Sequence, residues 1–207
     1  MSNTIQLNLI NQSNEVNTSE VVIFQKNVAT SFDELAVAWR VINNLGQSES
    51  HPFAFSYDMT VNAEDGDSSD TAPVSASSGE SFQMAQSQAG NRFSPKGKAR
   101  NTAEVQVQNN LAQGNIDAKV HRDGKLLASK KSIAPGQEVA FEFKPSIWVG
   151  VTPGTVEGAE MSSNEVASAS TELSLSGVAS ADIIMTGGGP GSASTPFVFT
   201  LENVVMA

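Results

Sequence analysis

The chain has 207 residues, no cysteine and a formal net charge of −10, from 22 acidic and 12 basic side chains. The lack of cysteine excludes disulfides, thiolate metal sites and cysteine nucleophiles, and the negative charge argues against nucleic acid or an anionic membrane as a partner. A chain of this length can bury a sizeable core without covalent cross-links, and all-β folds of this size often form one unit.

Apolar residues recur at every second position in short runs, which is typical of half-buried β-strands. Residues 5–10 and 21–24 are the first two predicted strands. Residues 35–42 fit either structure: apolar side chains alternate there as in a strand, whereas Ser31 and Glu34 match the capping box of a helix. The β-branched residues in this segment favour the strand.

A further strand pattern covers residues 51–62, where one face would carry Phe53, Phe55, Tyr57, Met59 and Val61. Residues 63–80 are almost entirely small or acidic and are expected to form a long loop. Strands are predicted at residues 81–86 and 103–108. Residues 92–100 between them are basic and rich in turn-forming residues.

A β-hairpin is predicted around Asp123 and Gly124. This dipeptide suits a two-residue turn whose central residues need positive φ angles, and alternating residues flank it on both sides. A second turn is expected at residues 134–136 and a loop at residues 152–163. The remaining predicted strands are residues 139–143, 147–151, 172–175, 181–185 and 197–205.

The last of these strands is too apolar to lie loose in water. We therefore expect it to pair within a sheet and to bury Phe197, Phe199 and Leu201.

Ten or more short strands with frequent turn signals predict an all-β fold. We expect one two-sheet antiparallel β-sandwich that spans residues 1–207. The alternative is two small β-domains that divide near residues 90–101.

The sequence contains no pattern that indicates an enzyme. His51 and His121 are the only histidines, and neither lies in a nucleophile or metal motif. Residues 1–10 hold no basic residue and no long apolar run, so no secretory signal is expected there, and no segment is apolar enough to span a membrane. We expect a cytoplasmic protein without a cofactor, with leaderless export left open.

Carboxylates are dense in the predicted loop after residue 63. Calcium prefers several hard oxygen ligands on a flexible segment. The candidate ligands are Glu64, Asp65, Asp67 and Asp70. The competing interpretation is a solvated acidic loop, because the segment does not match an EF-hand.

Basic residues are concentrated in one window of the sequence. Residues 92–144 hold ten basic and five acidic side chains, a balance of +5, whereas the rest of the chain holds two basic and 17 acidic side chains, a balance of −15. If these segments form opposite surfaces, copies of the chain can associate head to tail. The residues expected to mediate this contact are Lys96, Lys98, Arg100, Lys130 and Lys131.

The function expected from this charge division is that of a non-catalytic structural protein whose partner is a further copy of itself. The alternative is a β-sandwich module that binds a carbohydrate, a lipid headgroup or a protein. Strands that are distant in the sequence can interleave in a sandwich, and such a fold would mix the two segments on one surface.

Overall fold

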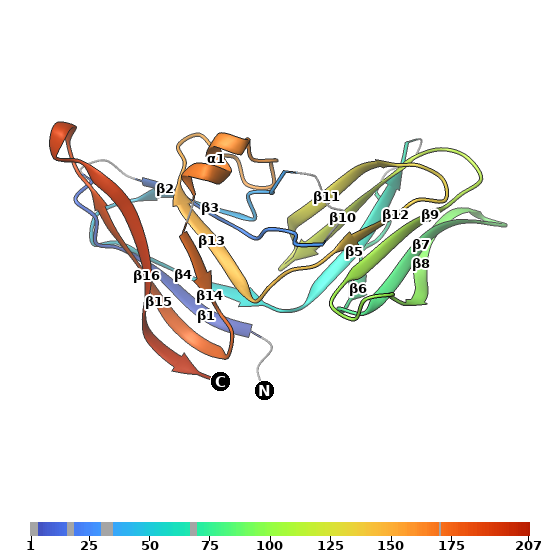
Figure 1. Ribbon diagram of the computed structural model, residues 1–207, viewed down its shortest axis with the longest axis horizontal. Helices are drawn as coiled ribbons and strands as arrows, with labels where there is room; N and C mark the ends of the chain where they lie inside the picture. Colours follow the sequence, from blue (N-terminus) through green and yellow to red (C-terminus); the bar gives the residue numbers. More distant parts are fainter. Residues whose placement is uncertain (1–3, 16–18, 30–34, 67–69, 170) are drawn as a thin grey trace. The chain divides into compact units, whose positions relative to one another are not determined.

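The computed structural model describes residues 4–15, 19–29, 35–66, 70–169 and 171–207, and over these residues the protein is all-β (Figure 1). The strands form four four-stranded sheets, two of which are mixed. The chain divides into two compact units. Unit 1 comprises residues 1–25, 35–57 and 145–207, and unit 2 comprises residues 26–34 and 58–144.

Unit 1 contains two of the sheets. The first has the order β16-β15-β1-β4, in which β1 and β15 run parallel. Its strands are β1 (Thr4–Asn11), β4 (Ser50–Ser56), β15 (Val178–Gly188) and β16 (Thr195–Met206). The second sheet has the order β14-β13-β2-β3. Its strands are β2 (Ser19–Phe24), β3 (Arg40–Leu45), β13 (Ser146–Val151) and β14 (Thr171–Ser174).

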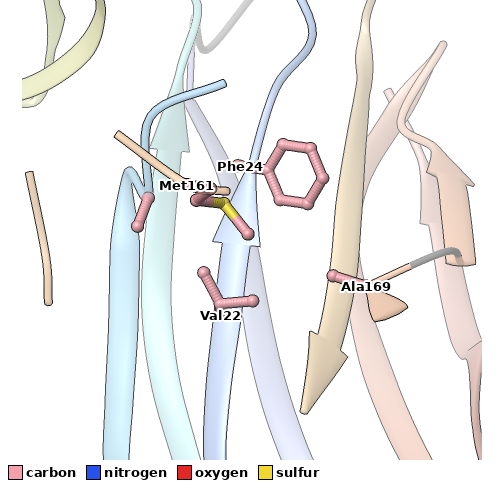
Figure 2. Packing of buried hydrophobic residues seen from close by; sticks show 5 residues of the cluster. Val22, Phe24, Met161 and Ala169 are labelled. Atoms are coloured by element: carbon pink, nitrogen blue, oxygen red, sulfur yellow. The ribbon is translucent and has the colours of Figure 1, made fainter. Parts of the chain in front are cut away.

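A buried apolar cluster in unit 1 joins β2 to the segment around helix α1 (Ser163–Ser168) (Figure 2). Figure 2 shows the side chain of Met161 beside that of Phe24, with Val22 and Ala169 in the same cluster. All of these side chains are fully buried. Long-range contacts of this kind tie a segment that follows β13 to the second strand of the chain. A short 3₁₀ helix, η1 (Gly191–Ala193), lies between β15 and β16.

Unit 2 contains the other two sheets. One has the order β11-β10-β5-β6, with strands β5 (Met59–Asp65), β6 (Val74–Ala76), β10 (Ile116–Arg122) and β11 (Lys125–Ile133). The other has the order β12-β9-β7-β8, in which β7 and β9 run parallel. Its strands are β7 (Glu80–Ser87), β8 (Gly90–Lys98), β9 (Val105–Asn110) and β12 (Glu138–Phe141).

The predicted hairpin is confirmed. β10 and β11 pair antiparallel, and the turn between them places Asp123 at φ 51° and Gly124 at φ 73°. Two positive φ angles are what this turn requires, and the twist that they impose matches that of the flanking strands. The turn at residues 134–136 is also confirmed, since Gln137 N donates to the carbonyl of Ala134 at 3.0 Å.

The single strand expected over residues 51–62 is wrong. β4 ends at Ser56 and β5 begins at Met59, so Tyr57 and Asp58 interrupt the pairing where the chain passes from unit 1 to unit 2. The alternation of apolar residues does not reveal this break, because odd-numbered apolar residues are buried both before it and after it.

Three other segments differ from the expectation. Residues 90–98 form strand β8 rather than turns, and Val74–Ala76 forms strand β6 within the expected loop. Helix α1 follows the loop at residues 152–163 and begins with a capping box, in which Ser162 Oγ accepts from the backbone of Glu165 and the Glu165 carboxylate accepts from the backbone of Ser162.

The ambiguous segment over residues 35–42 is partly extended. Strand β3 begins at Arg40, and Val37 forms an isolated bridge with Glu160. The capping-box pair of Ser31 and Glu34 lies outside the described residues. Residues 90–101, where the alternative interpretation of the sequence places a division between two domains, lie within unit 2. None of the helices in the described part of the chain is long and apolar enough to cross a membrane.

Candidate functional site

Charge is divided unequally between the two units. Unit 1 holds one basic and nine acidic residues, a balance of −8, and unit 2 holds eleven basic and thirteen acidic residues, a balance of −2. Every lysine of the chain belongs to unit 2. The single basic residue of unit 1, Arg40, has its guanidinium 4.6 Å from the ring centre of Trp39 and 5.4 Å from that of Phe53.

Two of the five basic residues predicted for self-association lie by Glu138 on β12, and a third is linked to it through Gln108. Arg100 Nε lies 4.0 Å from Glu138 Oε1, and Lys130 lines a hollow of about 270 Å³ together with Glu138. Lys96 donates a hydrogen bond to Gln108, which pairs with Glu138 across the β9–β12 register. We refer to Lys96, Arg100 and Lys130 as the basic patch.

The other two predicted residues lie apart from the basic patch. Lys98 is exposed at the end of β8 and pairs in register with Glu80 of β7. Lys131 is exposed on β11, next to Ser132, whose φ of 57° marks an irregularity in the strand. Both strands lie at the end of their sheet's strand order. Their side chains are therefore less enclosed by neighbouring strands than those of central strands.

The three predicted calcium ligands that the structure describes, Glu64, Asp65 and Asp70, do not converge on one point. Glu64 and Asp65 are consecutive residues of β5, and successive side chains of a strand project to opposite faces. Lys119 Nζ lies between two of the carboxylates, 2.9 Å from Glu64 Oε2 and 2.8 Å from Asp70 Oδ1. Asp65 Oδ2 instead accepts from Asn91 Nδ2 at 2.7 Å.

Asp67 lies outside the described residues. Among the residues that the structure does describe, no group of three His, Asp or Glu side chains could hold a metal ion. Calcium binding by this segment stays a prediction.

Lys119 and His121 lie on the same face of β10, and their pKa values shift in opposite directions. Burial alone would lower the pKa of Lys119, but its hydrogen bonds to Asp70 and Glu64 and their negative charges outweigh this effect and raise it. Burial lowers the pKa of His121 below its ordinary 6.5, although the charge of Asp70 opposes the shift. His121 Nδ1 is buried without a hydrogen-bond partner. His51 lies exposed on β4 of unit 1.

A cavity of about 640 Å³ opens at one end of unit 2. Its walls come from the end of β5, the end of β7, the start of β8 and the connection between β9 and β10. Sequence reasoning missed this cavity, because its residues come from four separate segments and no short motif joins them. The only local signal was the density of side-chain amides in residues 109–115.

Strand β16 leaves part of its apolar surface exposed. Of the three residues expected to be buried, Phe199 is 3% exposed, whereas Phe197 and Leu201 are only half-buried. The exposed apolar residues of this strand are Val198, Val204, Val205 and Met206. The expectation was too broad, because β16 lies at the end of its sheet and pairs with β15 alone.

Comparison of the chain with family models, with characterised proteins and with solved structures found no match.

Proposed function

We propose that this chain is a non-catalytic structural protein that associates with copies of itself, with the acidic unit 1 of one copy contacting the basic patch in unit 2 of the next. The observation that carries the proposal is the division of charge: unit 1 has a balance of −8, and all eight lysines belong to unit 2. A contact between two different surfaces is heterologous, so it either closes into a ring or extends into a filament.

Exposed apolar surface on β16 supports the same proposal. Val205 is 55% and Met206 63% exposed, and Glu202 is the only charged residue of the strand. Natural edge strands are usually protected by lysine, proline or bulges. β8 follows this rule, with Pro95, Lys96 and Lys98. The C-terminal half of β16 carries no lysine or proline and is protected only by irregular pairing with β15 near Asn203. Contact with a neighbouring copy would remove this surface from water.

We also propose that the two sheets of each unit pack face to face as a sandwich. Burial alternates along β10, where Ile116, Ala118 and Val120 are buried and the intervening residues are less so. In the other sheet of unit 2, Val105 and Val107 of β9 are buried. Sheets with one apolar face are stable when those faces meet across a shared core.

The test of self-association is the mass of the protein by light scattering, at several protein concentrations and salt levels. Surface charges are screened beyond about 8 Å at physiological ionic strength, so added salt should lower the mass. The variant Lys96→Glu with Lys130→Glu should lower it further at low salt.

The variant Lys26→Glu with Lys144→Glu is the matched control. It makes the same change in net charge elsewhere in unit 2 and should leave most of the association intact. A monomeric mass at high concentration and low salt would overturn the proposal. Equal loss of association in both variants would contradict the role of the basic patch.

A further inference from the structure

The cavity in unit 2 is lined by groups that both donate and accept hydrogen bonds. Four side-chain amides and one carboxylate reach it, together with the side chain of Leu111, which is 7% exposed. The polar lining residues are Asp65, Gln86, Asn91, Gln113 and Asn115. No lysine, arginine or aromatic residue is among the described residues that line it. Its volume, about 640 Å³, lies within the range of small-molecule sites, roughly 300–1,000 Å³.

One wall of the cavity is fixed by a hydrogen bond that joins the two sheets of unit 2. Asn91 Nδ2 at the start of β8 donates to Asp65 Oδ2 at the end of β5, at 2.7 Å. Asp65 is 9% exposed, so its carboxylate is held in place by its surroundings. This bond uses only the amide nitrogen of Asn91, so the carbonyl oxygen of the same side chain can accept a hydrogen bond from a ligand.

The opposite wall is shaped by a buried asparagine. Asn109 is fully buried, and its Nδ2 donates to the carbonyls of Gly114 at 2.9 Å and Ile133 at 2.8 Å. Its Oδ1 accepts from the backbone N–H of Leu111 at 3.1 Å. Two of these bonds hold the backbone of Leu111 and Gly114 and so restrain the loop between them. Gln113 and Asn115 are therefore presented from a preorganised loop, which lowers the entropic cost of binding a ligand.

We infer that this cavity binds a neutral carbohydrate, a mono- or disaccharide or the end of a longer glycan. Sugar hydroxyls donate and accept hydrogen bonds, as side-chain amides do. Leu111 and Ala112 supply apolar contact for the C–H groups of a sugar ring. The inference is independent of self-association, because it rests on different residues.

The lining selects against other ligand classes. A phosphate or carboxylate ligand would meet the charge of Asp65 with no cation to balance it. A nucleobase would find amides for its polar edge but no aromatic or guanidinium group to stack on, and stacking supplies much of the affinity for exposed bases. A lipid chain would need a mostly apolar wall, whereas five lining side chains are polar.

The test is saturation-transfer-difference NMR on the full chain, with glucose, galactose, N-acetylglucosamine, maltose, cellobiose, lactose and chitobiose as separate probes. At least one of these sugars should show transfer, and inorganic phosphate should not displace it. The variant Gln113→Ala with Asn115→Ala should bind that sugar roughly tenfold more weakly, because two hydrogen bonds are lost. Both residues are exposed, so the fold should be unaffected.

The variant Asp65→Asn removes the negative charge of this side chain and keeps its shape, and it should also weaken binding of the sugar. The control is Gln12→Ala, which removes an exposed amide of unit 1 and should leave binding unchanged. Absence of transfer to every probe would overturn the inference, as would displacement by phosphate. Binding that survives all of the cavity variants undiminished would overturn it as well.

Discussion

Substitution of Gly150 by alanine should destabilise unit 1 strongly. Gly150 lies buried on β13, and a Cβ atom placed there would be 2.2 Å from Ala169 Cα and 2.5 Å from Ala169 Cβ. Non-bonded carbons sit about 3.5–4.0 Å apart, so the end of helix α1 would have to move by more than ~1 Å. Ala169 belongs to the buried cluster with Val22 and Phe24 (Figure 2) and caps α1 through its N–H to the carbonyl of Glu165.

Overpacking of a core typically costs about 1–3 kcal/mol. We expect about 3 kcal/mol here, because the nearest atom is backbone and cannot turn away as a side chain can. That is a large part of a total stability of ~5–15 kcal/mol. The assay is urea denaturation followed by tryptophan fluorescence. Both tryptophans, Trp39 and Trp148, belong to unit 1, so the signal reports this unit.

Two controls separate the steric effect from other causes. Gly46→Ala in the same unit, where the atoms nearest to the new Cβ belong to the exposed and flexible side chain of Glu49 at 3.1 Å, should cost less than about 1 kcal/mol. Ala169→Gly should not rescue Gly150→Ala, because the Cα of residue 169 remains. A loss below about 1 kcal/mol for Gly150→Ala, or full rescue by Ala169→Gly, would refute the reasoning.

Two further predictions concern β16 and β10. Phe199→Ala should lower the free energy of unfolding by about 3 kcal/mol in urea denaturation. Val205→Thr, at an exposed position of β16, should change it by less than about 0.5 kcal/mol. An equally small loss for both variants would show that β16 is not part of the core. Because the folded state lowers the pKa of His121, the unfolded chain binds more protons as pH falls below about 6.5. Stability should therefore decline from that pH downward until the lowered pKa is passed, and His121→Gln should flatten this part of the profile; an unchanged profile would contradict it.

Strands with one buried face could be predicted from the sequence, and strands without one could not. The alternation of apolar residues is a local signal, and it located β1, β2, β9 and the β10–β11 hairpin. β8 buries only Phe93 and exposes most of its other residues, so no alternation marks it. Helix α1 buries none of its residues, and its only sequence signal was the capping box of Ser162 and Glu165.

The carboxylate cluster shows why residues close in sequence need not form a site. The sequence predicts Glu64 and Asp65 to lie in one loop, because the apolar alternation stops near Asn62. β5 continues to Asp65, so the pleat sends Glu64 towards Lys119 and Asp65 towards Asn91. The cavity shows the opposite case, in which residues that are distant in sequence lie close together. Its polar groups are far apart in sequence and meet only because four strand ends and loops converge.

The concentration of basic residues in one window follows from how the units are built along the chain. Residues 58–144 form the longer segment of unit 2 and lie between two segments of unit 1. The basic window, residues 92–144, falls wholly within this segment of unit 2. Both ends of the chain belong to unit 1, and no lysine or arginine follows Lys144. Strands of the two segments do not interleave in a shared sheet. The basic residues of the window therefore stay together in unit 2, but thirteen acidic residues of the same unit bring its balance to −2.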